Sequence, residues 1–296
     1  MSVFVVGDVA SDILAVYDGP LATGSDTPAE IRIVGGGAGA NTAAWLATTG
    51  VPVTFIGAVG ADAAGRERLA ELRTAGVRCA VRTVSDIPTG SIVVLSCGAE
   101  RSMLFDRGAN GRLQPSDVDA ALSGGGRGDH LHLSGYTLFD PASAPAGLRA
   151  LVAARALGMT TSVDAASAAP LTLLGPDRFL DWVRGADVLF ANLDEAGVLA
   201  GLRAGPVELA TALLPYSSIV IVKRGAQGAV WAGRDGARPV TVAALPVATV
   251  IDPTGAGDAF AAGFLARWRE NATPTDALAE AARQAAKAIT KIGSRP

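Results

Sequence analysis

The sequence predicts an α/β protein with a mainly parallel central sheet and a second, smaller β-sheet. Along most of the chain, short apolar runs that end in glycine or a polar residue alternate with helical stretches, the pattern of a parallel sheet covered by helices. Glycine accounts for 36 of the 296 residues, which suits the many tight turns of such a fold. The exception is residues 78–106, where three strand-like stretches follow one another with no helical stretch between them.

Composition excludes several classes of protein. Hydrophobic residues make up 49% of the chain and charged residues 18%, as in a globular protein with a sizeable core. The net charge of -3 provides no general basic field to attract nucleic acid or an anionic membrane. No apolar run has the roughly 18–20 residues of a membrane span, and residues 1–10 lack the basic start of a signal peptide. We therefore expect a cytoplasmic protein with no nucleic-acid or membrane partner.

The two cysteines, Cys79 and Cys97, are too few for a disulfide framework. Because disulfides are rare in cytosolic proteins, we expect both to be free thiols. They fall on strands predicted to be neighbours, so a single disulfide is the alternative.

The first part of the chain supplies a candidate ligand-binding carboxylate. Strands are expected at 3–6, 11–18, 30–34 and 53–57, and helices at 42–49 and 63–75. Asp12 lies just past the end of the first strand, at the edge where open α/β sheets bind their ligands. An aspartate in a surface turn is the alternative reading.

A glycine-rich run, Gly35-Gly36-Gly37-Ala38-Gly39-Ala40-Asn41, joins the strand at 30–34 to the next helix. Its spacing is not that of the dinucleotide-binding fingerprint, which argues against a nicotinamide or flavin site. We expect its backbone amides to contact a polyhydroxylated substrate, with Asn41 offering both a donor and an acceptor.

The helix-free part of the chain is expected to form a lid. Its three strand-like stretches, at 78–84, 89–96 and 101–106, predict an antiparallel meander. A meander inserted in a series of strands and helices is usually a separate small sheet. With 12–18 and 29–34 it would make a β-sheet lid.

The second part of the chain returns to strand–helix alternation. Strands are expected at 131–133, 161–163, 188–190 and 219–222, and helices at 116–122, 143–157, 176–184 and 206–213. His130 and His132 alternate on one strand without a cysteine or acid at ligand spacing, so they are read as structural histidines.

Two polar clusters follow strands of this part. Asn192 and Glu195 come after the strand at 188–190 and are one helical turn apart, a pair that suits a hydrated Mg²⁺. The alternative is a capping box that opens a helix. Lys223-Arg224-Gly225-Ala226-Gln227-Gly228 follows the next strand and can meet nucleotide phosphates or form a hairpin turn.

The most informative stretch is Asp252-Pro253-Thr254-Gly255-Ala256-Gly257-Asp258, which precedes an apolar helical face at 259–268. A glycine turn that opens a helix presents free backbone N–H groups to an anion. A carboxylate among such donors makes sense if Asp258 takes a proton from a hydroxyl that attacks the bound phosphoryl group. The alternative is a helix cap, since aspartate and glycine are common there.

With these pieces in order, the chain resembles the ribokinase (PfkB) family of sugar and nucleoside kinases. The resemblance covers the whole chain and rests on Gly36-Gly37-Ala38-Gly39-Ala40-Asn41, the stretch 252–258, Asn192-x-x-Glu195, Lys223-x-Gly225-x-x-Gly228 and the inserted meander. It implies a single ribokinase-like domain over 1–296, built as three α/β/α layers around a mainly parallel sheet. The β lid would come from about 12–34 and 78–107, and the resemblance also implies a homodimer formed through it.

The resemblance also implies an ATP-dependent phosphotransferase with an alcohol group as acceptor. Asp258 would be the catalytic base, and the amides of Gly255, Ala256 and Gly257 would form an anion hole. The implied roles of the other positions are substrate binding for Asp12, Gly36, Gly37 and Asn41, ATP binding for Asn192, Lys223, Gly225 and Gly228, water-mediated Mg²⁺ binding for Glu195, and a K⁺ site for Asp252, Thr254 and Gly293.

The acceptor is expected to be a neutral sugar with a primary hydroxyl, as for a ribokinase or fructokinase. Nucleosides (adenosine, cytidine or pseudouridine) and 2-dehydro-3-deoxygluconate are the alternatives. A sugar acid would need a cation, and Arg101 and Arg107 are the candidates, because their even spacing puts both on one face of a strand. Asp164-Ala165-Ala166-Ser167 lacks the Asn and Arg that keto-acid sugar kinases of the family tend to carry there, and position 38, often lysine in relatives, is alanine. A family fold kept only for binding would be expected to have lost Asp258 or the anion-hole glycines, and both are present.

Overall fold

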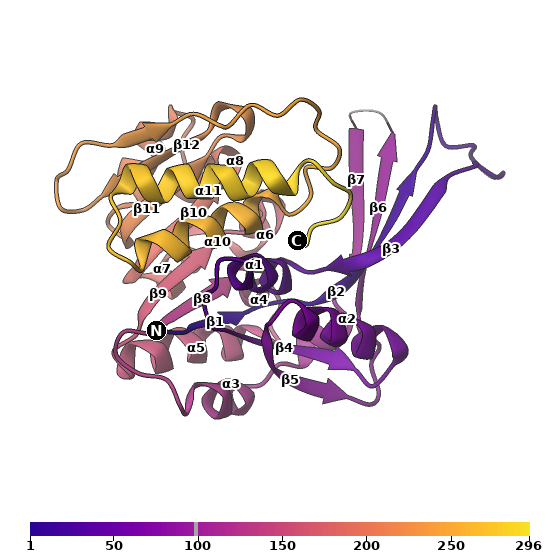
Figure 1. Cartoon of the computed structure of the whole chain (residues 1–296), viewed down its shortest axis with the longest axis horizontal. Coiled ribbons are helices and arrows are strands. Elements are labelled where there is room, and N and C mark those ends of the chain that lie inside the picture. Colours follow the sequence, from indigo (N-terminus) through magenta and orange to yellow (C-terminus); the bar gives the residue numbers. More distant parts are fainter. Residues whose placement is uncertain (98–99) are drawn as a thin grey trace.

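The larger of two sheets organises the molecule (Figure 1). The computed structural model describes residues 1–97 and 100–296, and all their side chains apart from those of residues 100 and 101. The sheet has nine strands in the order β13-β12-β11-β10-β9-β8-β1-β4-β5. Neighbours from β11 to β5 run parallel, whereas β12 and β13 are added antiparallel. The strands are β1 (Val3–Val6), β4 (Val53–Gly60), β5 (Arg78–Val84), β8 (His130–Ser134), β9 (Thr160–Asp164), β10 (Ala186–Asn192), β11 (Ser217–Lys223), β12 (Ala229–Gly233) and β13 (Val240–Val242).

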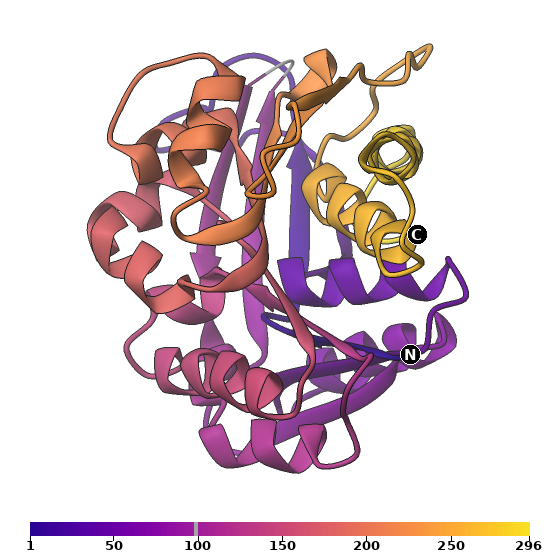
Figure 2. The same ribbon diagram turned by 90° about the vertical axis from the view of Figure 1, so that its left-hand side faces the viewer.

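Helices cover both faces of this sheet, so the α/β/α three-layer prediction is confirmed (Figure 2). One face carries α1 (Ala38–Ala47), α2 (Ala63–Thr74), α10 (Ala256–Trp268) and α11 (Pro274–Ala288). The other carries α3 (Pro115–Leu122), α4 (Tyr136–Phe139), α5 (Ala144–Ala156), α6 (Ala168–Leu174), α7 (Pro176–Val183), α8 (Leu193–Ala200) and α9 (Pro206–Leu213). Within the described part of the chain, no helix is long and apolar enough to cross a membrane.

The strands are buried on both faces because their side chains alternate between two hydrophobic cores. In β1, Val3 and Val5 pack against the layer of α1 and α10, while Phe4 and Val6 pack against the layer of α3 and α5. A run of four apolar residues is therefore what a central parallel strand needs, which is why periodicity located these strands well.

The smaller sheet has four strands in the order β3-β2-β6-β7 and stands at the side of the main body (Figure 1). Its strands are β2 (Ala10–Val16), β3 (Glu30–Gly36), β6 (Gly90–Cys97) and β7 (Glu100–Asp106). β2 pairs antiparallel with β3 but parallel with β6, which in turn pairs antiparallel with β7.

One element of the predicted lid is placed elsewhere. β5, expected as the first strand of a meander at 78–84, pairs in parallel with β4 and forms the edge of the larger sheet. It follows α2 and therefore completes a strand–helix–strand unit with parallel strands, a connection that gave no separate signal in the sequence. Cys79 and Cys97 consequently lie in different sheets, and both are free thiols.

The two histidines have structural contacts, as the sequence predicted. His130 packs edge-on against Trp268 of α10, and His132 packs edge-on against Phe190 of β10. His130 contacts Thr160 and Ser162 through its ring nitrogens, and His132 shares Ser162, each at 2.8 Å. Burial lowers the pKa of both rings, that of His132 to about 4, so they are neutral at physiological pH.

Candidate active site

Polar residues, the predicted Asn192 and Lys223 among them, meet at the carboxyl ends of the central strands. Asp164 ends β9, Asn192 ends β10 and Lys223 ends β11, and these three strands are neighbours in the sheet. The N-terminal turns of α1 and α10 face one another across this edge, because Asn41 of α1 reaches Asp258 of α10. Ligands of open α/β sheets bind at such an edge.

The N-cap position of α10 is a glycine. Gly255 lies in the left-handed region (φ 77°) and has no side chain with which to cap the helix. A Cβ at Gly255 would lie 2.6 Å from the carbonyl oxygen of Ser294, so glycine is required by space as well as by conformation. The amide of Ala256 donates to Pro253 O at 3.3 Å, so the three predicted anion-hole amides are not equivalent.

Asp258 is the third residue of α10 and is not its cap, so the capping alternative is wrong for this residue. Its Oδ2 accepts a hydrogen bond from Asn41 Nδ2 at 2.9 Å. Burial raises the pKa of Asp258 from its ordinary 3.8 to about 7, the Asn41 hydrogen bond opposes this, and the charge of Asp164 reinforces it. A carboxyl group poised near neutrality can accept a proton and release it again.

Asp12 lies on β2 of the small sheet, beside the glycine-rich loop. Its side chain is 3% exposed, and its Oδ1 has no hydrogen-bond partner among the side chains and backbone groups that the structure describes. A Cβ at Gly36 would collide with the carboxylate, so the loop can pass only as glycine. Burial raises the pKa of Asp12 to about 6, against the opposing charge of Arg295. A buried acceptor without a donor is unfavourable until a ligand hydroxyl supplies one.

Asn192 and Glu195 form the capping box that was the alternative reading. Asn192 Oδ1 accepts from the Glu195 amide at 2.9 Å, and Glu195 Oε2 accepts from the Asn192 amide at 2.7 Å. Glu195 is 3% exposed, and burial raises the pKa of its carboxyl group, with Lys223 opposing the shift. Capping therefore fixes the carboxyl group of Glu195 at the end of β10, beside Lys223.

Lys223 joins the two halves of this cluster. Its Nζ donates to Asp164 Oδ2 at 2.7 Å, and both side chains are about 15% exposed. Burial alone would lower the pKa of Lys223, but the carboxylates of Asp164 and Glu195 outweigh it and raise the pKa, so the ammonium stays charged. A Cβ at Gly257 would lie 3.3 Å from Nζ, which places this cation beside the first turn of α10.

The segment after Lys223 forms the hairpin turn that the sequence allowed. Gly225 (φ 55°) begins a short 3-10 turn, η2 (Gly225–Gln227), and Gly228 (φ 84°) leads into β12, which pairs antiparallel with β11. At Gly228 a Cβ would collide with the carbonyl oxygen of Val242. The hairpin itself therefore requires glycine at these two positions, independently of any bound nucleotide.

The three residues of the expected cation site are brought together although 39 positions separate Thr254 from Gly293 (293 − 254). Asp252 Oδ1 accepts from the amide and hydroxyl of Thr254, at 2.9 and 2.6 Å. Asp252 Oδ2 accepts from the Gly293 amide at 3.0 Å. This ties the turn before α10 to the last residues of the chain.

Arg107 does not lie on a lid strand, and the same-face argument with Arg101 is wrong for this reason. β7 ends at Asp106, and Arg107 opens the 3-10 helix η1 (Gly108–Arg112). Its guanidinium donates to Asp8 Oδ1 at 2.7 Å and to Ser143 Oγ at 3.1 Å, and Asp140 lies 3.4 Å away. The side chain of Arg101 lies outside the described part of the structure.

Several residues at the site were missed by sequence reasoning. They are Asp8, Tyr136, Asp164, Ser294 and Arg295. Asp8 and Asp164 carried a signal, since Asp164 ends a buried parallel strand and Asp8 closely follows one. Tyr136, Ser294 and Arg295 follow no motif and are recognisable only by their position in the folded structure. Burial raises the pKa of Tyr136 to about 12.

Comparison with known proteins agrees with this geometry. A sequence model described as pfkB family carbohydrate kinase matches residues 1–296. An ATP-dependent ribose-1-phosphate kinase from Halopiger xanaduensis is 34% identical over 84% of this chain and 78% of its own. A ribokinase from Arabidopsis thaliana is 28% identical over 99% and 77% of the two chains.

Solved structures give the same picture. An adenosine kinase from Sinorhizobium meliloti superposes with a TM-score of 0.88 at 25% identity and covers 100% of this chain and 95% of its own. A putative ribokinase II from E. coli, in complex with ATP and Mg²⁺, reaches 0.86 at 25% identity and covers 99% and 94%.

Proposed function

Because this chain belongs to the pfkB family of carbohydrate kinases, we propose that it transfers the γ-phosphoryl group of ATP to a primary hydroxyl group of a neutral sugar, with Asp258 as general base. The observation that carries this proposal is the Asn41–Asp258 hydrogen bond at the start of α10, whose N-cap is a glycine. It puts a carboxyl group with a pKa of about 7 beside backbone donors that suit an anion.

In this reaction the acceptor oxygen forms a bond to phosphorus while the bond between phosphorus and the ADP oxygen breaks. Asp258 takes the hydroxyl proton, and the amide of Gly257 with the ammonium of Lys223 stabilises the charge on the transferred group. Phosphoryl transfer requires mainly positioning and charge stabilisation, which these fixed groups supply. The lid would exclude water from the transfer.

The residues at the ends of β10 and β11 fit ATP with Mg²⁺. Lys223 brings a positive charge for phosphates, and Glu195 is a buried carboxylate fixed by its capping box. Mg²⁺ that keeps its waters would neutralise phosphate charge, with Glu195 and Asn192 orienting those waters. The hairpin of Gly225 and Gly228 would lie along the nucleotide. The E. coli neighbour that contains ATP and Mg²⁺ supports this assignment.

A monovalent cation, K⁺, is proposed at the turn held by Asp252, Thr254 and Gly293. That turn is continuous with Gly255, so a cation there would fix the shape of the anion-binding amides. Turnover should be higher in K⁺ than in matched Na⁺ buffer at saturating substrate. Equal rates would rule the site out.

The acceptor proposal rests on the free Oδ1 of Asp12 and on the engagement of Arg107. A carboxylate without a donor suits sugar hydroxyl groups, and Gly36 brings the backbone of the glycine-rich loop against this carboxylate. Arg107 already faces Asp8 and Asp140 and is therefore a poor partner for an acidic acceptor.

The test is an ADP-release screen with ATP and Mg²⁺ over D-ribose, D-fructose, adenosine, cytidine, pseudouridine, 2-dehydro-3-deoxygluconate and ribose 1-phosphate. The last is included because of the Halopiger relative, and adenosine because of the Sinorhizobium structure. We expect ribose or fructose to give the highest kcat/KM. A preference for a nucleoside, a sugar acid or a sugar phosphate by tenfold or more would overturn the neutral-sugar assignment.

We also propose that the chain works as one domain and dimerises through its lid. The edge strands β3 and β7 expose large apolar side chains, 63–64% for Ile31, Ile33, Leu104 and Phe105. Apolar residues on unpaired sheet edges favour association with another chain.

A further inference from the structure

The side-chain amide of Asn41 lies between Asp258 and the last residues of the chain. Its Nδ2 donates to Asp258, while its Oδ1 faces Ser294 Oγ at 3.1 Å and Arg295 Nε at 3.4 Å. Asn41 is 4% exposed, so water offers its amide few alternative partners. The substrate role proposed for Asn41 leaves these contacts unexplained.

The neighbours on its two sides allow the amide only one orientation. A guanidinium can only donate, so the side of the amide that faces Arg295 must be the oxygen. An ionised carboxylate can only accept, so the side that faces Asp258 must be the NH₂ group. Ser294 can donate to Asn41 or, at 3.2 Å, to the carbonyl of Gly35, and it therefore does not fix the orientation alone.

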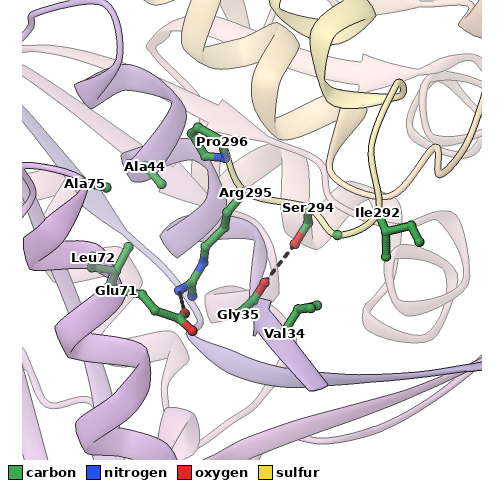
Figure 3. A pocket seen from close by; sticks show the side chains of 11 residues that line it. Val34, Gly35, Ala44, Glu71, Leu72, Ala75, Ile292, Ser294, Arg295 and Pro296 are labelled. Carbon is green, nitrogen blue, oxygen red and sulfur yellow. Dashed lines mark hydrogen bonds and ion pairs between the residues drawn. The ribbon is translucent and has the colours of Figure 1, made fainter. Parts of the chain in front are cut away.

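The last residues are themselves held in place. Arg295 donates to Glu71 Oε2 and to the carbonyl oxygen of Gly36, both at 2.8 Å, as the view of the adjoining pocket shows for Glu71 (Figure 3). The indole of Trp45 donates to the carbonyl of Ser294 at 2.9 Å, and Ser294 also reaches Gly35 in Figure 3. Glu71 of α2 and the Gly36 carbonyl of β3 thus fix the position of the guanidinium, and Trp45 of α1 fixes the backbone before it.

We infer that Arg295, assisted by Ser294, is a positioning residue that acts through Asn41 on the carboxylate of Asp258. It fixes the amide with its NH₂ group toward the carboxylate, which both orients Asp258 and stabilises its ionised form. Without Arg295 the amide can turn its oxygen toward Asp258, and the carboxylate then loses a donor and faces an acceptor. The effect on catalysis rests on the proposed function of Asp258 as the base, whereas the contacts from Arg295 through Asn41 to Asp258 do not depend on that proposal.

The direct measurement is the titration of Asp258, followed by the ¹³Cγ signal of aspartate-labelled protein and assigned with Asp258→Asn. The ionisable side chains that face Asp258 are unchanged in every variant below and are Asp12 from β2, Tyr136 from α4, Asp164 from β9 and Lys223 from β11. Losing a hydrogen bond to the ionised form should raise the pKa of Asp258 in Arg295→Met by about one unit.

Dependence on Asn41 is tested by a double-mutant cycle. Asn41→Ala should raise the same pKa, and Arg295→Met in that background should add less than about a third of its own effect, because the amide through which it acts is gone. Arg283→Met, which removes an exposed arginine paired with Glu280, is the matched control and should leave the titration unchanged. The inference would be overturned if Arg295→Met left the pKa of Asp258 unchanged. It would also be overturned if the pKa changes caused by Asn41→Ala and Arg295→Met were additive.

Ser294→Ala guards against misfolding, since it removes only a hydroxyl group and should shift the pKa in the same direction by less. In turnover assays with the fastest acceptor of the screen, Arg295→Met should lower kcat about tenfold and move the acid limb of the pH profile upward. A failure of the proposed function gives a different result. In that case Asp258→Asn keeps its turnover, while Arg295→Met still raises the pKa of Asp258 in the NMR titration.

Discussion

Replacing Asp258 by asparagine should abolish turnover and at the same time stabilise the protein at alkaline pH. The carboxylate is held where burial and the charge of Asp164 oppose its ionisation, and its pKa is raised from 3.8 to about 7. The difference, 7 − 3.8 = 3.2 units, corresponds to about 4 kcal/mol of unfavourable free energy once the group is ionised. Asp258 is partly exposed, and solvent screening reduces this to about 2 kcal/mol.

The sign follows from the direction of the pKa shift. The folded pKa lies above the unfolded one, so the protonated carboxyl contributes stability that is fully present below about pH 4 and is lost as pH rises through about 7. Asparagine has no charge to bury at any pH. The gain in stability of Asp258→Asn over wild type should therefore be near zero at pH 4 and reach about 2 kcal/mol at pH 8, or about 4 °C in Tm.

Two assays on the same samples check this. Thermal unfolding at pH 4 and pH 8 gives the stability difference, and ADP release at saturating substrates gives turnover, while ATP affinity should change little because the backbone amides remain. Asp181→Asn, at an exposed site paired with Arg184, is the control and should alter neither quantity. If Asp258→Asn kept more than a tenth of wild-type turnover, the assignment of Asp258 as the base would be wrong. Equal gains in Tm at both pH values would show that ionisation of Asp258 does not destabilise the folded protein.

The remaining predictions concern other parts of the site and the lid. Wild-type kcat/KM should fall tenfold per unit below about pH 7 as Asp258 becomes protonated, and a flat profile from pH 5 to 8 would contradict a base with that pKa. Asp12→Ala should raise the acceptor KM by one to two orders of magnitude (about 2 kcal/mol for hydrogen bonds to a charged group), whereas Arg107→Ala should raise it little; the reverse order in steady-state assays would favour an acidic acceptor. Gly255→Ala should lose at least a hundredfold in kcat (about 3 kcal/mol for a misplaced anion donor), because its Cβ meets Ser294, and near-normal turnover would show that the turn can adjust. Phe105→Glu should convert a dimer into a monomer by light scattering, and a wild-type monomer or an unaffected dimer would exclude the lid interface.

Local pattern predicted the fold well where neighbouring residues decide the outcome. The apolar runs of β1, β8, β10 and β11 were located from periodicity, because a doubly covered parallel strand must be apolar on both faces, and so were the helices α3, α5, α7 and α9. β5 was assigned to the wrong sheet because edge strands of either sheet look alike in sequence. The helix α1 begins at Ala38, earlier than predicted, since the glycine run masks its first turn.

The candidate site divides in the same way. Local pattern was enough to place Asn192 and Lys223 at the ends of strands and Asp258 at the start of a helix, and the carboxyl ends of parallel strands meet the starts of the following helices at one edge. Asp12 belongs to β2 of the smaller sheet, so this rule does not account for its place.

Which of these groups form hydrogen bonds with one another depends on the folded chain. Asn41 bonds Asp258 across 217 positions and Lys223 bonds Asp164 across 59, and neither pairing leaves a periodic trace. Arg295 gave no signal at all, since its effect depends on a guanidinium lying on one side of an amide and a carboxylate on the other. Hydrogen bonds are set by distances of about 3 Å, and such distances between remote segments exist only once the chain has folded.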